Sequence, residues 1–400
     1  MRVSTGMIFQ RGLEALQRQQ AAALDTQQHI AAGKRVLRPS DDPVAASRAI
    51  ETSQAKALNA QYGANQAAAR ETLALTESVL ADIGNVLQDV RVLVLNAGSG
   101  ALTDADRRSL AIDLRGKYEH LLGLVNSTDG AGNYLFAGYA ADKAPFVKSV
   151  TGVQYVGDQG NRSLQVGPAQ TVAISENGAE LFERLREGNG VFVAQADPGN
   201  SGTAAADIGR TLGGQTEPVN YSITFSVAGG VTTYTVTNHN TGDVSAPVPY
   251  TSGQPIVIDN MEFTISGEPA DGDSFTVRPA AQKNVFAMLD ELIAALEEPL
   301  LDGAARARFG EQMALGLTNV DKAFDRVLVV RTAMGASLRQ LEALNETVQD
   351  KALHYEERLS QLLDLDYAEA ITKLAREQMA LEAAQLSYQR ITSLSLFNYL

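Results

Sequence analysis

The sequence has no cysteine, no tryptophan and no long apolar run. Without cysteine, no disulfide, thiolate nucleophile or cysteine-bound metal can contribute to its fold or chemistry. No stretch reaches the ~18 consecutive apolar residues of a transmembrane helix. The start of the chain, MRVSTGMIFQRG, lacks the apolar core of a cleavable secretory signal. We therefore expect neither a disulfide-stapled nor a membrane-spanning protein.

Aromatic residues and basic residues are also scarce. Aromatics are 6% of the 400 residues, so a core has to rest on Leu, Val, Ile and Ala, which are the residues of helix–helix seams. The formal net charge is −14, and residues 151–280 alone have 5 basic and 14 acidic side chains, 5 − 14 = −9. Because an acidic chain repels phosphate backbones, no nucleic-acid partner is expected.

Residues that carry catalysis or hold metals are not grouped in the sequence. No H-E-x-x-H, G-x-S-x-G or phosphate-binding glycine loop occurs. Asp271-Gly-Asp273 lacks the later ligands of a calcium loop and is interpreted as a turn. We therefore expect no enzymatic activity, no cofactor and no metal site. The four histidines are far apart in the sequence: His29, His120, His239 and His354.

Apolar residues in the first and last thirds recur at alternating steps of three and four, which predicts long paired helices. The last third keeps this spacing from Leu317 to Leu362, with Arg331 and Asn345 as its two polar positions. A helix of ~46 residues is on the order of 70 Å long, so it must lie along other helices. Its expected partner is the N-terminal seam of Leu73, Thr76, Leu80, Ile83, Leu87, Val90, Val94 and Ala97.

Two shorter helices are expected between these long ones. Thr103 is expected to begin one, with Asp106 completing a capping box, and it ends in the turn at 126–130. The other covers 285–296 and ends before Pro299.

The middle of the chain changes to a two-residue alternation. Residues 221–227 alternate apolar and hydroxyl side chains, and a Gly-Gly turn connects them to 231–236, which predicts a β-hairpin. Residues 188–214, rich in Gly, Ala, Ser and Asp, are expected to be a loop or linker. Further short strands are expected at 153–156, 163–166, 171–174, 256–258, 263–265 and 274–277.

These patterns predict an α+β multidomain fold, with a long antiparallel helical bundle or coiled coil formed by both chain ends and a β-rich domain inserted in the middle. Three parts are expected. Residues 1–45 plus 355–400 are terminal helices that form an inner assembly layer. Residues 46–149 plus 283–354 form a helical-bundle domain. Residues 150–282 form a β-rich outer domain, which the 188–214 segment can divide into two small β units.

Apolar side chains also line the two tips of the chain, where most proteins fray. They indicate either a helix docked on its own chain or a contact with neighbouring subunits. We expect them to form the assembly interface of the terminal helices. These residues are Leu13, Leu16, Leu24, Ile30, Ile371, Leu374, Leu381, Leu394, Leu396, Phe397, Tyr399 and Leu400.

Residues 32–46 hold a distinctive connector. A helix ends at Gly33, Lys34 and Arg35 follow, and Pro39-Ser40-Asp41-Asp42-Pro43 begins the next helix with a capping residue before proline. Four other segments accompany it: MRVST at 1–5, GNYLFAG at 132–138, DYAEA at 366–370 and ITSLSLFNYL at 391–400. Together they resemble the flagellin superfamily of axial proteins and, within it, the hook-associated protein 3 family of hook–filament junction proteins.

The resemblance implies a structural adaptor of the bacterial flagellum. Such a protein joins hook-associated protein 1 to the flagellin filament as a ring of its own copies. The resemblance also implies export by the flagellar type III system without a cleaved signal peptide, a cytoplasmic export chaperone at the C-terminal helix, and a final location in the extracellular flagellum.

Three other interpretations remain open at this point. A flagellin-like filament subunit belongs to the same class, but both chain ends disfavour it. A secreted type III coiled-coil effector or adhesin could share the long helices, but the sequence shows no membrane-active apolar stretch. A hydrolase carried on the middle domain would reveal itself as turnover by the 150–282 fragment.

Overall fold

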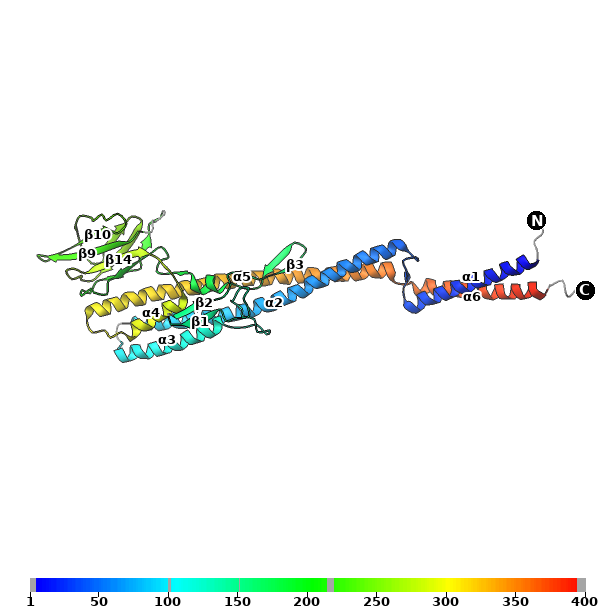
Figure 1. The fold of residues 1–400 in the computed structure, drawn as a ribbon, viewed down its shortest axis with the longest axis horizontal. Helices are drawn as coiled ribbons and strands as arrows, with labels where there is room; N and C mark the ends of the chain where they lie inside the picture. Colours follow the sequence, from blue (N-terminus) through cyan, green and yellow to red (C-terminus); the bar gives the residue numbers. More distant parts are fainter. Residues whose placement is uncertain (1–4, 100–101, 151, 214–218, 394–400) are drawn as a thin grey trace, which may run out of the picture. The chain divides into compact units, whose positions relative to one another are not determined.

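The computed structural model describes residues 5–99, 102–150, 152–213 and 219–393 (Figure 1). The backbone divides into two compact units. The terminal unit comprises residues 1–66 and 342–400, and the central unit comprises residues 67–341. The predicted fold class is confirmed, since long helices from both ends of the chain pair with each other and the strands lie between them in sequence. The finer three-part division stays a prediction.

The terminal unit is built from four helical segments. α1 (Thr5–Ala32) packs along α6 (Tyr367–Ser393), and the two lie side by side (Figure 1). The other pair is the first part of α2 (Pro43–Ala97) and the last part of α5 (Gly303–Leu363). Lys56 Nζ lies 2.9 Å from Glu356 Oε1, and Asn59 Nδ2 donates to the Val348 carbonyl at 2.8 Å. Residue numbers rise along α2 as they fall along α5, so the pair is antiparallel.

In the central unit the same two helices form a buried seam. All eight apolar-seam positions predicted on α2 between residues 73 and 97 are at most 2% exposed. Arg331 of α5 occupies one seam position and its guanidinium binds the Glu77 carboxylate, with Nη2 2.7 Å from Oε1. A second ion pair joins Arg91 and Asp321 at 2.7 Å. The polar seam residue thus has a charged partner on the facing helix.

Two shorter helices complete the helical part of the central unit. α3 (Asp104–Val125) begins at the predicted capping box, in which Thr103 Oγ1 accepts the Asp106 amide and Asp106 accepts the Thr103 amide. α4 (Val285–Glu297) has Asn284 as its N-cap. No helix in the described ranges is both long enough and apolar enough to span a bilayer.

The strands form small antiparallel sheets. The largest has the order β11-β10-β9-β14-β6, and a second has β12-β13-β7 with β8 also paired to β13. Three two-stranded pairs are β1–β2, β3–β4 and β15–β5, and one turn of π-helix, η1 (Ala179–Glu183), precedes β5. The strand bounds are β1 Phe146–Ser149, β2 Gly152–Tyr155, β3 Ser163–Gly167, β4 Gln170–Ala173, β5 Leu185–Arg186, β6 Phe192–Ala196, β7 Ala205–Ala206, β8 Arg210–Thr211, β9 Tyr221–Ala228, β10 Val231–Asn238, β11 Val248–Pro249, β12 Pro255–Ile258, β13 Met261–Ser266, β14 Ser274–Pro279 and β15 Gln282–Lys283.

The predicted hairpin is confirmed as β9 and β10. Ala228 pairs with Val231 across a turn in which Gly229 and Gly230 both have positive φ, 61° and 81°, the conformation that a two-residue hairpin turn requires. Alternate residues of β9 enter the core of the β-rich part. That core consists of Phe192, Ala194, Ala196, Ala204, Ala206, Tyr221, Ile223, Phe225, Ile256, Met261, Phe263, Ile265, Phe275 and Val277.

The expectation that residues 188–214 are all loop is wrong. The segment contains β6, which pairs with β14 over five residues, and the short strands β7 and β8. Its alanines are strand residues here, and Ala194 and Ala196 of β6 are buried in the core. The local composition of residues 188–214 could not indicate this strand, because β6 is stabilised by pairing with β14, some 80 residues away in the sequence.

Polar side chains of α5, among them Glu311, Asn319 and Arg308, attach it to the β-rich part of the central unit. The Glu311 carboxylate, 7% exposed, accepts the backbone amides of Ala196 at 2.8 Å and Ala206 at 3.4 Å. The other two bonds run from α5 to the loops that flank β6: Asn319 Oδ1 accepts the Gly188 amide at 2.8 Å, and Arg308 Nη1 donates to the Asn200 carbonyl at 3.0 Å.

Candidate assembly interface

The pairing of α1 with α6 uses one stripe of each helix. The less exposed positions recur at steps of three and four, as in a coiled coil. Phe9 and Tyr388 meet at one end with ring centroids 6.4 Å apart, and Gln19 Nε2 donates to the Glu377 carbonyl at 3.4 Å. The stripe consists of Phe9, Gly12, Leu16, Gln19, Ala23, Thr26 and Ile30 on α1, and of Ala370, Leu374, Glu377, Leu381, Ala384 and Tyr388 on α6.

The predicted interface residues separate into two groups. Leu16, Ile30, Leu374 and Leu381 lie half-buried in the α1–α6 seam. Three others point away from it, with 48% of Leu13, 52% of Leu24 and 57% of Ile371 exposed. The remaining five lie outside the described residues: Leu394, Leu396, Phe397, Tyr399 and Leu400.

The exposed members belong to a second apolar set, which we call the outer stripe. Met379 and Leu386 of α6 join it, with 62% and 53% of their surface exposed. Ile371, Met379 and Leu386 are spaced eight and seven residues apart, so they share one face of α6. Each terminal helix therefore has one apolar face used within the chain and another that its own chain leaves uncovered.

The seam also contains polar residues, which the sequence interpretation missed. Gln19 and Glu377 occupy seam positions, and Thr26 is 3% exposed with a hydroxyl that has no hydrogen-bond partner. Gly12 leaves room for the Tyr388 ring, since a Cβ there would lie 3.0 Å from Cδ2. Counting three/four steps from Phe9 onward, rather than selecting large apolar residues, would have found this stripe.

The connector motif forms the turn between α1 and α2. Gly33 follows the last residue of α1 with φ of +67°, and the amides of Gly33 and Lys34 donate back to the carbonyls of Ile30 and His29. This is a left-handed C-terminal cap, which favours glycine. The connector also pairs with the end of α5, because the Arg35 amide donates to the Leu363 carbonyl at 2.7 Å.

Carboxylates and a guanidinium stabilise the rest of the connector. Asp42 Oδ1 accepts the Ala45 amide at 2.9 Å, so Asp42 is the N-cap of α2 and Pro43 its first residue. That hydrogen bond, followed by the one from Arg35, lowers the pKa of Asp42. Asp41 Oδ2 accepts the backbone amides of Arg38 and Leu37, and the hydrogen bond from Arg38 contributes most to its lowered pKa.

The other two motif residues are exposed on the connector surface. Ser40 Oγ lies 3.4 Å from Asp41 Oδ1, and Pro39 is exposed beside it. The motif thus forms one compact turn, within which the side chains of Arg35, Asp41 and Asp42 form hydrogen bonds.

Gly33 provides a direct test of this connector. We expect Gly33→Ala to destabilise the terminal helices by at least ~1–2 kcal/mol, the cost of left-handed backbone for an L-residue. A Cβ would also lie 2.8 Å from the Tyr367 hydroxyl oxygen. Urea unfolding followed by far-UV circular dichroism measures the loss. In a Tyr367→Phe background the same substitution should cost less, and an equal or smaller loss in wild type than in that background would contradict the close contact.

The described residues hold no group of three or more His, Asp or Glu side chains placed to bind a metal ion. Charged side chains at the connector and along the helices instead pair with neighbours or face solvent.

Comparison with known proteins places both helical ends in one class. Residues 3–141 match the bacterial flagellin N-terminal helical region, and residues 317–400 match the bacterial flagellin C-terminal helical region. Together these cover more than half of the chain. The helical regions at both ends of the chain are those of a flagellin-type axial protein.

Relatives that match along nearly their whole length identify one family within this class. The chain is 31% identical to flagellar hook-associated protein 3 of Salmonella typhimurium, over 99% of both chains. It is similar to the crystal structure of Xanthomonas campestris FlgL, with TM-score 0.73 and 29% identity over 77% of this chain and 99% of that one. The flagellar junction protein FlgL of Legionella pneumophila gives TM-score 0.71 and 28% identity, over 79% of this chain and all of that one. This chain belongs to the hook-associated protein 3 family.

Proposed function

We propose that this chain is the structural adaptor that joins hook-associated protein 1 to the flagellin filament. The observation that carries the proposal is the outer stripe of Leu13, Leu24, Ile371, Met379 and Leu386 on the α1–α6 pair. A protein that acted alone would leave this apolar surface in water. In a ring of its own copies, neighbouring subunits would cover it.

The energetics of the terminal unit support an assembly role. Burying one Leu or Ile side chain contributes ~1.5–3 kcal/mol, so covering the outer stripe could supply several times the stability of a polar helix pair. The α1–α6 seam, with Gln19, Glu377 and an unpartnered Thr26 hydroxyl, supplies less than an apolar seam would. Contact with neighbours therefore favours the assembled state over the free chain.

The same proposal includes a route and further partners. We infer export by the flagellar type III system without a cleaved signal, with a cytoplasmic chaperone covering the C-terminal helix α6 before export. The exposed Ile371, Met379 and Leu386 give such a chaperone an apolar surface to bind. We propose the extracellular flagellum as the final location and no catalytic activity, since the relatives are named as components of the flagellum.

Deletion of the gene tests the junction role directly. We expect hooks without filaments by electron microscopy, and flagellin lost into the medium, because exported flagellin would have no surface on which to polymerise. Expression of the full chain from a plasmid should restore filaments. Normal filaments in the deletion strain would contradict the proposal and favour a redundant flagellin-like subunit or a secreted effector.

A further inference from the structure

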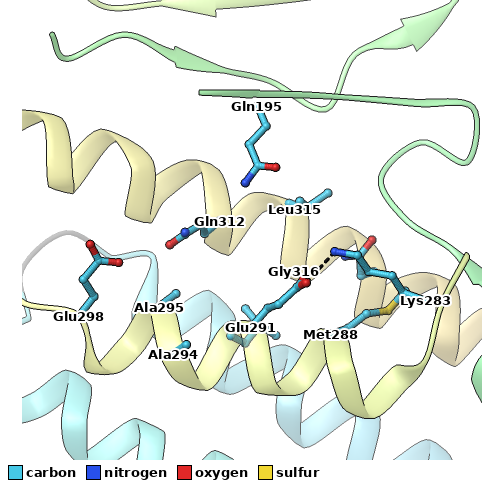
Figure 2. Close-up of a pocket in the computed structure, with 12 residues that line it drawn as sticks. Gln195, Lys283, Met288, Glu291, Ala294, Ala295, Glu298, Gln312, Leu315 and Gly316 are labelled. Carbon is cyan, nitrogen blue, oxygen red and sulfur yellow. Dashed lines mark hydrogen bonds and ion pairs between the residues drawn. The ribbon is translucent and has the colours of Figure 1, made fainter. Parts of the chain in front are cut away.

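A pocket of about 310 Å³ lies in the central unit between α4, α5 and strand β6. Figure 2 shows that Gln195 extends from β6 toward the helices, while Gln312 belongs to α5 and Glu298 stands at the end of α4. The floor is apolar and includes Met288, Leu292, Ala295 and Leu315. The pocket thus combines apolar side chains with polar ones contributed by β6, α4 and α5.

At one end of this pocket, every charged side chain is paired with a side chain of opposite charge. Lys283 Nζ lies 2.7 Å from Glu291 Oε1 and 3.0 Å from Glu187 Oε2, and Arg278 also pairs with Glu187. Two cations and two carboxylates therefore balance here. Glu187 is fully buried, so this network is fixed structure and leaves no charge for a ligand.

At the other end, polar and charged side chains have no partner in the part of the chain that the structure describes. Among the described residues, the side chains of Glu298, Gln195 and Gln312 form no hydrogen bond or ion pair, although all three line the pocket. Glu298 also stands at the C-terminal end of α4, where a negative charge is disfavoured by the helix dipole. The carboxylate of its neighbour Glu297 is also disfavoured by the helix dipole, but Arg115 forms an ion pair with Glu297 at 2.8 Å. Glu298 is exposed and its carboxylate has no such cation within the described ranges, although Arg107 Nη2 donates to the Glu298 backbone carbonyl at 2.9 Å.

We propose that this pocket binds a guanidinium or primary ammonium group. The Glu298 carboxylate pairs with the cation, and the side-chain oxygens of Gln195 and Gln312 accept its remaining N–H groups. The methylene groups of the ligand lie on the apolar floor. A guanidinium fits best, because it is planar, carries five donors and is weakly hydrated. The cation can come from a small amine in solution or from an arginine of another protein.

Isothermal titration of the full-length chain with butylguanidinium at low salt tests this site. We expect saturable binding that weakens about tenfold in Glu298→Gln, the effect of losing one charge-assisted hydrogen bond. Gln312→Leu should weaken it severalfold. Glu297→Gln is the matched control, because it removes the same charge from the adjacent residue, and it should bind as wild type does. Circular dichroism confirms that each variant is folded.

Two further ligands complete the test. Butylurea, the neutral analogue, should bind at least tenfold more weakly than butylguanidinium. N-acetyl-arginine amide distinguishes the source of the cation: binding as tight as that of butylguanidinium indicates an arginine of a partner protein, and weaker binding indicates a small free amine. The proposal is overturned if no binding saturates, if Glu297→Gln and Glu298→Gln lose affinity equally, or if butylurea binds as well as butylguanidinium.

Discussion

A chain with aspartate at both Leu24 and Ile371 is expected to fold as the wild type does but to support no filaments. Both side chains are more than half exposed, so the substitutions should change the free energy of unfolding by no more than ~0.5 kcal/mol each. In the proposed ring the same positions become buried. Each aspartate then removes an apolar contact of ~1.5–3 kcal/mol and places an unpaired carboxylate in an apolar interface.

Complementation of the deletion strain provides the measurement. The double variant should leave cells without filaments and without motility, while far-UV circular dichroism of the purified protein stays unchanged. Ile112→Asp is the matched control: Ile112 is 71% exposed on α3 of the central unit and outside the outer stripe, so motility should persist. Normal filaments with the double variant would show that the outer stripe is not an assembly surface.

Glu311 should make the stability of the protein depend on pH between about 4.5 and 7. Burial raises the pKa of this carboxyl from 4.5 to about 7, against the opposing effect of the amide hydrogen bonds from Ala196 and Ala206. The folded-state pKa lies above that of the unfolded chain. The favourable contribution is therefore fully present below pH 4.5 and is lost as pH rises through 7, in total about 3 kcal/mol.

Glu311→Gln isolates this contribution, because glutamine does not ionise and keeps an oxygen for the Ala196 amide. The unfolding free energy of Glu311→Gln relative to wild type should rise by about 3 kcal/mol between pH 4.5 and 8. Urea denaturation followed by circular dichroism is suitable, since the chain has no tryptophan. Glu346→Gln, an exposed position on the same helix, controls for the loss of one charge. A difference that does not change with pH would contradict the raised pKa.

Glu311→Ala should have a lower unfolding free energy than Glu311→Gln at every pH. It leaves two backbone amides, those of Ala196 and Ala206, buried without acceptors, at a cost of ~1–3 kcal/mol for each. The β-rich part of the central unit would lose one of its polar attachments to α5.

Local patterns predicted much of this fold because their physical causes are local. Thr103 and Asp106 are three residues apart, and the two glycines of the β9–β10 turn are adjacent, so cap and hairpin are visible in the sequence. The α2 seam was predicted residue by residue, since a three/four spacing fixes which face of a helix is apolar. The helix–loop–helix at the connector was predicted from two further local signals, the glycine that ends one helix and the capping residue before the proline of the next.

Pairing between distant segments was the part that could not be predicted. β6 was missed because its two alanines look like linker residues until β14 is placed beside them. Glu311 looked like any surface glutamate, and only the strands packed on α5 bury it. The pocket at Glu298 likewise combines residues from β6, α4 and α5, which no single stretch of sequence brings together.

The sequence by itself determined that both ends are long helices, that the middle is β-rich, and that the tips carry more apolar surface than one helix pair can use. Which apolar residues serve the chain itself was decided only by tertiary structure. Leu16 and Leu24 are equivalent as side chains, but α6 packs against one face of α1 and so covers Leu16 and leaves Leu24 in solvent. A helix with two apolar faces can bury either one, and the packing partner makes the choice.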